Sequence, residues 1–405
     1  RAGSPLPQAA PMLPAQTSQA ALKPKVMICI TEDWFLLSHF RPLARALVEA
    51  VGDVVVVTTS SGRSPEIEAL GARVVAFDFE RASLDPVRQA GIVRRLRQLI
   101  AVERPDVIHA IALKPIALAG LAFLATGVGL AKPRFVMHLT GVGFAGTSAA
   151  GRSSLVYGMT LRLMARLLRR ADVALLVENP DDAARVAGTG WQRHGNVTIL
   201  GGAGVDPAKL PAVPMPSGVP PVAGFLGRMV WTKGVDVLVA AHEQLQARGV
   251  ELELRLGGTP DVSNPRAFSL TELAAWARNP AIECTGRVDD SGAFWAGVHV
   301  AVVPSRGGEG MPRALLEAAA TGRPLIVSDV AGCRYFVRHE REGLVVPADD
   351  ATALADALER LVANPDLARR LGENARARML DGFTERHVAE AVIAAYMQLL
   401  NPTKR

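Results

Sequence analysis

The chain has 405 residues, 49% hydrophobic and 21% charged, which is the composition of a globular protein long enough for two or three domains, and its three cysteines lack the CxxC spacing of zinc sites. Its net charge of +6 is uneven, because residues 23–205 hold 22 Lys/Arg and 15 Asp/Glu whereas residues 206–405 hold 22 and 24. The basic first half predicts an anionic partner, and nucleic acid is not expected, because no nucleic-acid motif is present and aromatic residues are only 5%.

The first half of the chain begins with a Pro-, Ala- and Gln-rich segment, residues 1–22, which we predict to be a disordered leader without the apolar run of a signal peptide. Residues 23–206 then alternate between short β-branched runs and helical patterns. This alternation indicates a parallel sheet with helices on both faces. The expected strands are 26–30, 54–58, 74–77, 107–110, 135–139, 173–177 and 197–200, and the expected helices are 40–51, 66–70, 91–103, 116–125 and 155–170.

Two segments of this half raise the question of membrane contact. Residues 115–131 carry no charge over 17 residues, which is just short of a span, and they lie between expected strands, so we expect a core helix. The helix expected at 155–170 admits two interpretations, namely core packing with a solvated edge and docking on anionic lipid. Its basic edge consists of Arg162, Arg166, Arg169 and Arg170.

Residues 207–221 contain six prolines and predict a linker between domains. The strand–helix alternation then restarts over residues 222–383, which indicates a second doubly wound α/β domain with a cleft between the two. The expected strands are 222–226, 251–256, 282–284, 298–303, 325–327 and 344–346, and the expected helices are 235–247, 270–278, 314–321 and 351–362.

Within the second half, Glu309 lies in a Gly-rich loop and Glu317 lies on the helix that this loop is expected to open. A helix N-terminus attracts anions, and carboxylates accept hydrogen bonds from hydroxyls, so this pair suits a ligand that is both anion and polyol. A nucleotide-sugar is such a ligand. Arg228 and Lys233 follow the first strand of the same domain, where two cations can clamp a diphosphate.

Three histidines of the first half, His39, His109 and His138, fall at or just after expected strand ends, where a cleft would lie. No metal-ligand spacing accompanies them, so we expect a functional role without a metal for at least one. Gly141 and Gly143 follow the strand at 135–139, and they allow a ligand to approach the backbone closely.

Taken together, these residues resemble glycosyltransferase family 4, of the GT-B fold, from about residue 25 to residue 400. The resemblance is strongest to the bacterial group that extends undecaprenyl-diphosphate-linked glycans and exopolysaccharides. The phrases that carry it are FLLSHFRPLARAL, RPDVIHAIALKP, HLTGVGF, NPDD, GAGVD, GRMVWTKG, GEGMPRALLEAAATGRPLIVSDVAGCR and EGLVVPADD. The GT-B fold implies two tandem Rossmann-like domains, with residues 384–405 forming a helix that crosses back to the first.

The resemblance also implies roles for individual residues. Arg228 and Lys233 would hold the donor diphosphate, and Glu309 would meet the donor sugar. Glu317 would bind the ribose. Further donor-side positions are Gly310, Met311 and Arg287, and acceptor-side positions are His39, His109, Gly141 and Gly143. His138 is the candidate for a catalytic histidine that family members place after this strand, although the register also allows Leu139 at that position.

The expected activity is therefore retaining transfer of a sugar from a UDP-sugar to a lipid-diphosphate-linked or polysaccharide acceptor, without a metal or other cofactor. The expected location is cytoplasmic, with peripheral contact to the inner face of the membrane. Alternatives within the fold are a UDP-sugar 2-epimerase and a transferase for soluble acceptors. The alternative outside enzymes is a scaffold that binds UDP-sugars without turnover. The donor sugar, the acceptor and the linkage do not follow from the residues.

Overall fold

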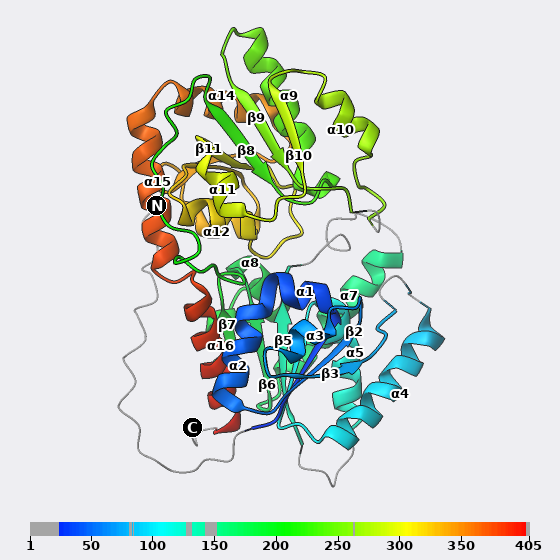
Figure 1. Cartoon of the computed structure of the whole chain (residues 1–405). Coiled ribbons are helices and arrows are strands. Elements are labelled where there is room, and N and C mark those ends of the chain that lie inside the picture. Colours follow the sequence, from blue (N-terminus) through cyan, green and yellow to red (C-terminus); the bar gives the residue numbers. More distant parts are fainter. Residues whose placement is uncertain are drawn as a thin grey trace.

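The computed structural model describes residues 24–80, 83, 85–126, 132–141, 152–261 and 264–401, without the side chains of residues 152 and 153. In this part of the chain two α/β domains lie one above the other, each built on a parallel sheet with helices on both faces (Figure 1). The predicted fold class is thereby confirmed. The predicted leader, residues 1–22, and Gly143 lie outside the described residues.

The N-terminal sheet has seven described strands in the order β3-β2-β1-β4-β5-β6-β7, all parallel. Its central strands are mostly aliphatic, and β4, β6 and the first five residues of β1 are buried, since a parallel sheet is covered on both faces. The strands are β1 (Val26–Glu32), β2 (Val54–Thr59), β3 (Arg73–Ala76), β4 (Val107–Ile111), β5 (Arg134–Leu139), β6 (Val173–Val177) and β7 (Val197–Ile199).

The helices of this domain mostly follow the predicted pattern, with exceptions after β1 and after β6, where the helix at residues 180–187 was not predicted. The segment between the strand expected at 26–30 and the helix expected at 40–51 is helical, because Leu36, Leu37 and Phe40 turn inward to cover the sheet. Its second part is a π-helical turn, a form that often occurs at functional sites. The helical elements are α1 (Asp33–Phe35), η1 (Leu36–Phe40), α2 (Arg41–Val51), α3 (Ser64–Glu68), α4 (Pro86–Glu103), α5 (Leu113–Leu124), α7 (Arg152–Leu168), α8 (Pro180–Ala187) and η2 (Trp191–Arg193).

The C-terminal sheet has six described strands in the order β10-β9-β8-β11-β12-β13. They are β8 (Val222–Leu226), β9 (Glu253–Gly257), β10 (Ile282–Gly286), β11 (Val300–Val303), β12 (Leu325–Ser328) and β13 (Gly343–Val346). The helical elements are η3 (Trp231–Lys233), α9 (Val235–Ala247), α10 (Leu270–Trp276), α11 (Ser291–Ala296), α12 (Arg313–Ala320), α13 (Ala331–Phe336), α14 (Ala351–Val362), α15 (Pro365–Leu380) and α16 (Glu385–Leu400).

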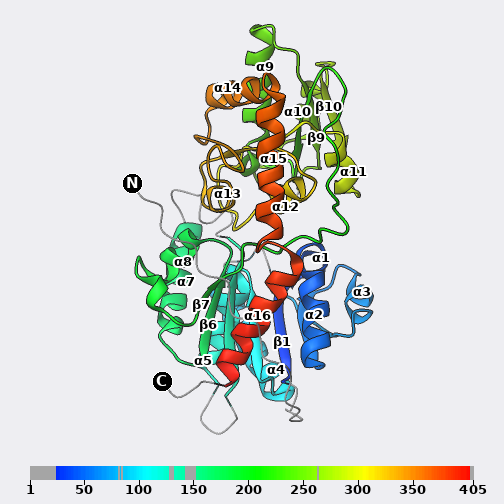
Figure 2. The same ribbon diagram turned by 90° about the vertical axis from the view of Figure 1, so that its left-hand side faces the viewer.

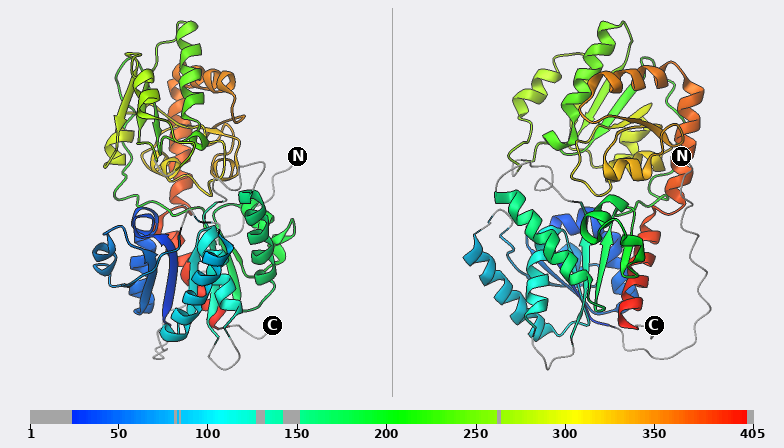
Figure 3. Two further views of the ribbon diagram at one scale, coloured as in Figure 1. Left: turned by 90° about the vertical axis from the view of Figure 1, so that its right-hand side faces the viewer. Right: turned by 180° about the vertical axis from the view of Figure 1, so that it is seen from behind.

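The last helix returns to the N-terminal domain. Figures 2 and 3 show α15 against the upper domain and α16 continuing down along the lower one, where Val388, Val392 and Tyr396 enter the N-terminal core. The two crossings between the domains lie side by side: Val205 N–H donates to Phe383 O at 3.2 Å, and Glu385 N–H donates to Val205 O at 3.0 Å. The two segments that connect the domains are thus joined to each other by backbone hydrogen bonds.

The uncharged stretch at 115–131 is described as far as residue 126; its first part lies in α5, which buries Ile116, Ala119 and Ala122 in the N-terminal core. Of the helices in the described residues, none combines the length and the apolar character that crossing a membrane requires.

Candidate functional site

Two loops of the C-terminal domain meet at the carboxyl ends of its central strands. Lys233 ends the short η3 turn after β8, and Glu309 lies in the loop between β11 and α12. The Lys233 Nζ forms an ion pair with the Glu309 Oε2, and Glu309 Oε1 accepts a hydrogen bond from Ser305 Oγ at 2.8 Å. Their side chains are 19% and 22% exposed, so both can still be reached from the cleft.

Arg228 follows the same first strand but extends further into solvent. Its side chain is 52% exposed, and its Nη1 donates to Asp261 Oδ2 at 2.7 Å. Because the Arg228 side chain is half exposed, solvent screens its ion pair with Asp261, and the guanidinium can turn toward a diphosphate at modest energetic cost. Among the described residues no cluster of three or more His, Cys, Asp or Glu side chains could hold a metal ion.

Glu317 lies one turn into α12 and is largely buried. Arg313 Nε donates to its Oε1 at 2.9 Å, and Arg313 Nη1 also donates across the cleft to the backbone oxygen of Ser38 at 3.1 Å. Glu317 and Arg313 line a cavity of about 430 Å³ together with Asp289 and Asp290. Arg287, which was predicted on the donor side, directly follows β10, where it is 80% exposed and paired with Asp289.

Gly310 and Met311 lie against the N-terminal domain. Gly141 has φ of +104°, and a Cβ there would overlap the Gly310 nitrogen, so only glycine permits this approach. Sequence reasoning assigned no role to Glu178 and Asn179, yet both contact the Gly310–Met311 peptide from the end of β6. An acidic residue directly after a wholly apolar strand was the available signal.

His39 lies on the π-helical turn and faces the cationic groups of the other domain. Burial, and then the charges of Arg313, Lys233 and Arg228, lower the pKa of its imidazole to about 4. Its Nδ1 is 2.7 Å from Ser38 Oγ. His39 is therefore neutral at neutral pH and lies at the cleft, on the side opposite the C-terminal cations.

The structure does not bring His109 and His138 to the cleft. Both are fully buried in the N-terminal domain, with His109 Nε2 3.2 Å from His138 Nδ1 and His109 Nδ1 2.6 Å from the hydroxyl of Tyr396 on α16. The prediction that these strand-end histidines lie on the rim differs from this arrangement, because Tyr396 of α16 covers His109 and Phe40 of η1 packs against His138. Burial lowers the pKa of both rings.

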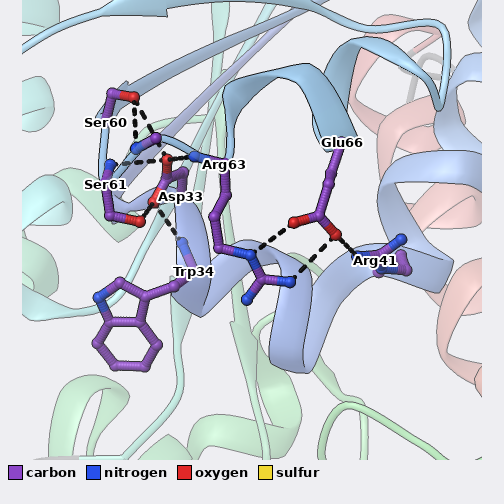
Figure 4. Close-up of polar contacts among 8 residues, drawn as sticks. Asp33, Trp34, Arg41, Ser60, Ser61, Arg63 and Glu66 are labelled. Carbon is purple, nitrogen blue, oxygen red and sulfur yellow. Dashed lines mark hydrogen bonds and ion pairs between the residues drawn. The ribbon is translucent and has the colours of Figure 1, made fainter.

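Two loops of the N-terminal domain are tied together by a buried carboxylate, as Figure 4 shows. Asp33 Oδ2 accepts hydrogen bonds from the backbone N–H groups of Ser61 and Arg63 at 2.8 and 3.1 Å, and Oδ1 accepts from Trp34 N–H at 2.7 Å. Burial raises the pKa of Asp33, but the Ser61 hydroxyl, which donates to Oδ1 at 2.5 Å, and these backbone donors outweigh it and hold the pKa below its usual value. An ionised Asp33 therefore fixes the loop after β2 to the turn after β1.

The chain matches two family models and several bacterial enzymes. The glycosyl transferase 4-like domain matches residues 38–202, and glycosyl transferases group 1 matches residues 220–364. The lipopolysaccharide core biosynthesis glycosyltransferase LpsE of Rhizobium meliloti is 33% identical over 56% of this chain and 63% of its own length. The N,N'-diacetylbacillosaminyl-diphospho-undecaprenol alpha-1,3-N-acetylgalactosaminyltransferase of Campylobacter jejuni is 23% identical over 89% of this chain and 96% of its own. The chain thus spans less than two thirds of the length of LpsE but almost all of the Campylobacter enzyme.

Solved structures agree on the fold. Anabaena HepE, determined in complex with UDP and glucose, superposes with a TM-score of 0.71 at 15% identity over 92% of this chain and 98% of that one. The sucrose-phosphate synthase of Thermosynechococcus elongatus gives 0.74 at 21% identity over 94% and 100%. At these identities the likeness concerns the fold, which is GT-B.

Proposed function

Since the chain belongs to glycosyltransferase family 4, with the GT-B fold, we propose that it transfers a sugar from a UDP-sugar to an acceptor of bacterial cell-surface glycan synthesis. The acceptor is a glycan linked to a lipid diphosphate, or a growing polysaccharide. One observation carries the proposal: Lys233 and Glu309 meet at the carboxyl ends of the C-terminal strands, within the cleft between the domains.

The donor side can be assigned group by group. Lys233 and Arg228 supply the positive charge that holds the diphosphate, and the N-terminus of α12 lies close by. We propose that these groups make a metal ion unnecessary. Glu309 accepts hydrogen bonds from the sugar hydroxyls and Glu317 from the ribose, for which the cavity of about 430 Å³ beside α12 offers space. HepE, which has the same fold, was determined with UDP and glucose.

Transfer breaks the bond between the anomeric carbon and the diphosphate oxygen, and it forms a bond from that carbon to an acceptor hydroxyl. The hydroxyl proton passes to the departing phosphate oxygen, on the face that the diphosphate leaves, so the anomeric configuration is retained. No covalent protein nucleophile is required. Lys233 and Arg228 stabilise the negative charge that develops on the leaving group. Closure at the paired crossing of Val205 and Glu385 excludes water from the cleft.

The acceptor side is proposed from charge and similarity. The basic N-terminal half suits an acceptor diphosphate, and His39 faces the cleft as a neutral imidazole. The Campylobacter relative acts, by its name, on an undecaprenol-diphosphate glycan. A diphosphate-linked lipid acceptor at the cytoplasmic face of the membrane accounts for the basic N-terminal half and agrees with the acceptor of the Campylobacter relative.

Binding of a UDP-sugar should raise the melting temperature of the protein. At a ligand concentration of 100 times Kd the expected stabilisation is about 2.7 kcal/mol, or about 3 °C for a chain of this size. A thermal-shift screen of nucleotide-sugars measures this, with inorganic diphosphate at equal concentration as the control. An equal shift with diphosphate alone would contradict the uridine and sugar assignments.

The exposed stripe on α7 is the proposed contact with the membrane. Leu155 and Met159 are 64% and 59% exposed near the start of the helix. Three exposed arginines, Arg162, Arg166 and Arg169, continue the same face. An apolar tip followed by basic side chains suits the surface of an anionic lipid bilayer.

Replacing these three arginines by glutamine should weaken binding to phosphatidylglycerol vesicles by about two orders of magnitude, at about 1 kcal/mol for each charge. Co-sedimentation measures the partitioning. The matched control replaces Arg278, Arg369 and Arg370, which are exposed on the C-terminal domain and change the net charge equally. Equal losses in the two triple variants would refute α7 as the docking surface.

A further inference from the structure

The peptide group that joins Gly310 to Met311 is held at both of its polar ends by the other domain. Met311 N–H donates to Glu178 Oε2 at 2.7 Å, and Asn179 Nδ2 donates to the Gly310 carbonyl oxygen at 2.9 Å. Two consecutive residues of the N-terminal domain therefore determine the orientation of one peptide of the C-terminal domain. The first residue of that peptide, Gly310, directly follows Glu309.

The contact is buried and closely packed. Glu178 is 4% exposed and Asn179 is fully buried. A Cβ at Gly310 would overlap Glu178 Oε2, and one at Gly332 would overlap the Gly310 oxygen, so the backbone is enclosed from both sides. Buried polar groups without partners are costly, so these hydrogen bonds hold the loop in one position while the domains are together.

The Asn179 amide is oriented by its own helix. Asn179 is the N-cap of α8: its Oδ1 accepts a hydrogen bond from Asp182 N–H at 2.9 Å. The amide nitrogen then points the other way, toward Gly310 O and toward Asp182 Oδ2, which accepts from it at 2.9 Å. Because both amide atoms have matched partners, the flipped orientation would lose several hydrogen bonds.

We propose that Glu178 and Asn179 are positioning residues for sugar transfer, which hold the Gly310–Met311 peptide so that Glu309 is aligned only when the two domains have closed. This inference rests on the proposed transferase function. It assigns to the segment after β6 a task distinct from binding, namely coupling of domain closure to the geometry of the donor loop. A displacement of about 1 Å in such a group can cost about 100-fold in rate.

The ionisation of Glu178 gives this role a readout of its own. Burial raises the pKa of the Glu178 carboxyl to about 8; the Met311 N–H opposes this rise, and the carboxylates of Asp182 and Glu309 add to it. Glu309 is in turn paired with Lys233. Above pH 8 the ionised Glu178 carboxylate would therefore add a second negative charge near Glu309, and kcat should fall. Glu178→Gln keeps an acceptor for Met311 N–H and cannot ionise, so it should lose this alkaline fall.

The experiment compares four variants of the full chain in steady-state transfer assays. Glu178→Ala and Asn179→Ser, which keeps the helix cap, should lower kcat about tenfold to 100-fold and change the donor KM less than about threefold. Glu178→Gln should stay within about threefold of the wild type at pH 7. The control is Asp181→Asn, which removes the charge of the neighbouring interdomain ion pair between Asp181 and Arg334 (3.0 Å) without touching the Gly310 peptide, and it should leave kcat unchanged.

Equal kcat values for Glu178→Ala and Asp181→Asn, or an unchanged alkaline fall in Glu178→Gln, would overturn the proposal. Hydrogen exchange at the Met311 amide provides a test without activity: it should accelerate in Glu178→Ala and remain slow in Asp181→Asn. If Glu178→Ala does not fold, the pH profile of Glu178→Gln decides. A wild type that transfers no sugar would refute the proposed function instead, whereas the exchange result would still report on the peptide contact.

Discussion

Lys233→Ala is expected to lower the rate of sugar transfer by about 100-fold to 1000-fold, because it removes a preorganised positive group from the leaving diphosphate. The chain should stay folded, since the lost ion pair with Glu309 is partly exposed and such pairs contribute little to stability. Steady-state kinetics with the cognate donor, together with thermal melting, measures both effects.

Lys25→Ala is the matched control for this variant. Lys25 is similarly exposed, at 24%, and forms ion pairs with Asp53 and Glu103 at the opposite end of the N-terminal sheet. It should alter stability to a similar extent and leave kcat intact. Full activity in Lys233→Ala would refute the assignment of the diphosphate clamp.

Glu309→Ala should reduce transfer to a similar degree, about 100-fold to 1000-fold, because the donor sugar loses its acceptor of hydrogen bonds and Lys233 loses the group that orients it. The double variant Lys233→Ala/Glu309→Ala should be hardly slower than either single variant, since the two groups act as one unit. Glu103→Gln, which alters a mostly buried carboxylate paired to Lys25, serves as the control. Strictly additive losses in the double variant would argue against a shared role.

Much of the fold could be predicted from the sequence, because parallel strands that are buried on both faces have sequences of short aliphatic runs. The observed bounds of β6, β8, α9 and α14 coincide with the expected runs. The proximity of Lys233 and Glu309 could also be predicted, since both follow strands of one sheet and such strand ends share one edge. The structure brings Lys233 and Glu309 into contact there.

The rest depends on contacts between distant segments, which local patterns do not contain. His109 and His138 were expected on the rim, but both are fully buried: Tyr396 on α16, 287 residues after His109, covers His109, and Phe40 packs against His138. The contact between Glu178 and Met311 depends likewise on how the two domains dock. Neither spacing nor composition distinguishes a cleft residue from one that a later helix covers.

The most direct test of the account is a transfer assay with the wild-type protein, a labelled UDP-sugar chosen by the thermal-shift screen, and an undecaprenyl-diphosphate-linked glycan. We predict that the label moves to the lipid-linked acceptor in equal amount to the UDP released, with the donor's anomeric configuration retained, and only when the acceptor is present. Conversion of the UDP-sugar to its 2-epimer without acceptor, or binding without turnover for every donor and acceptor pair, would contradict the account.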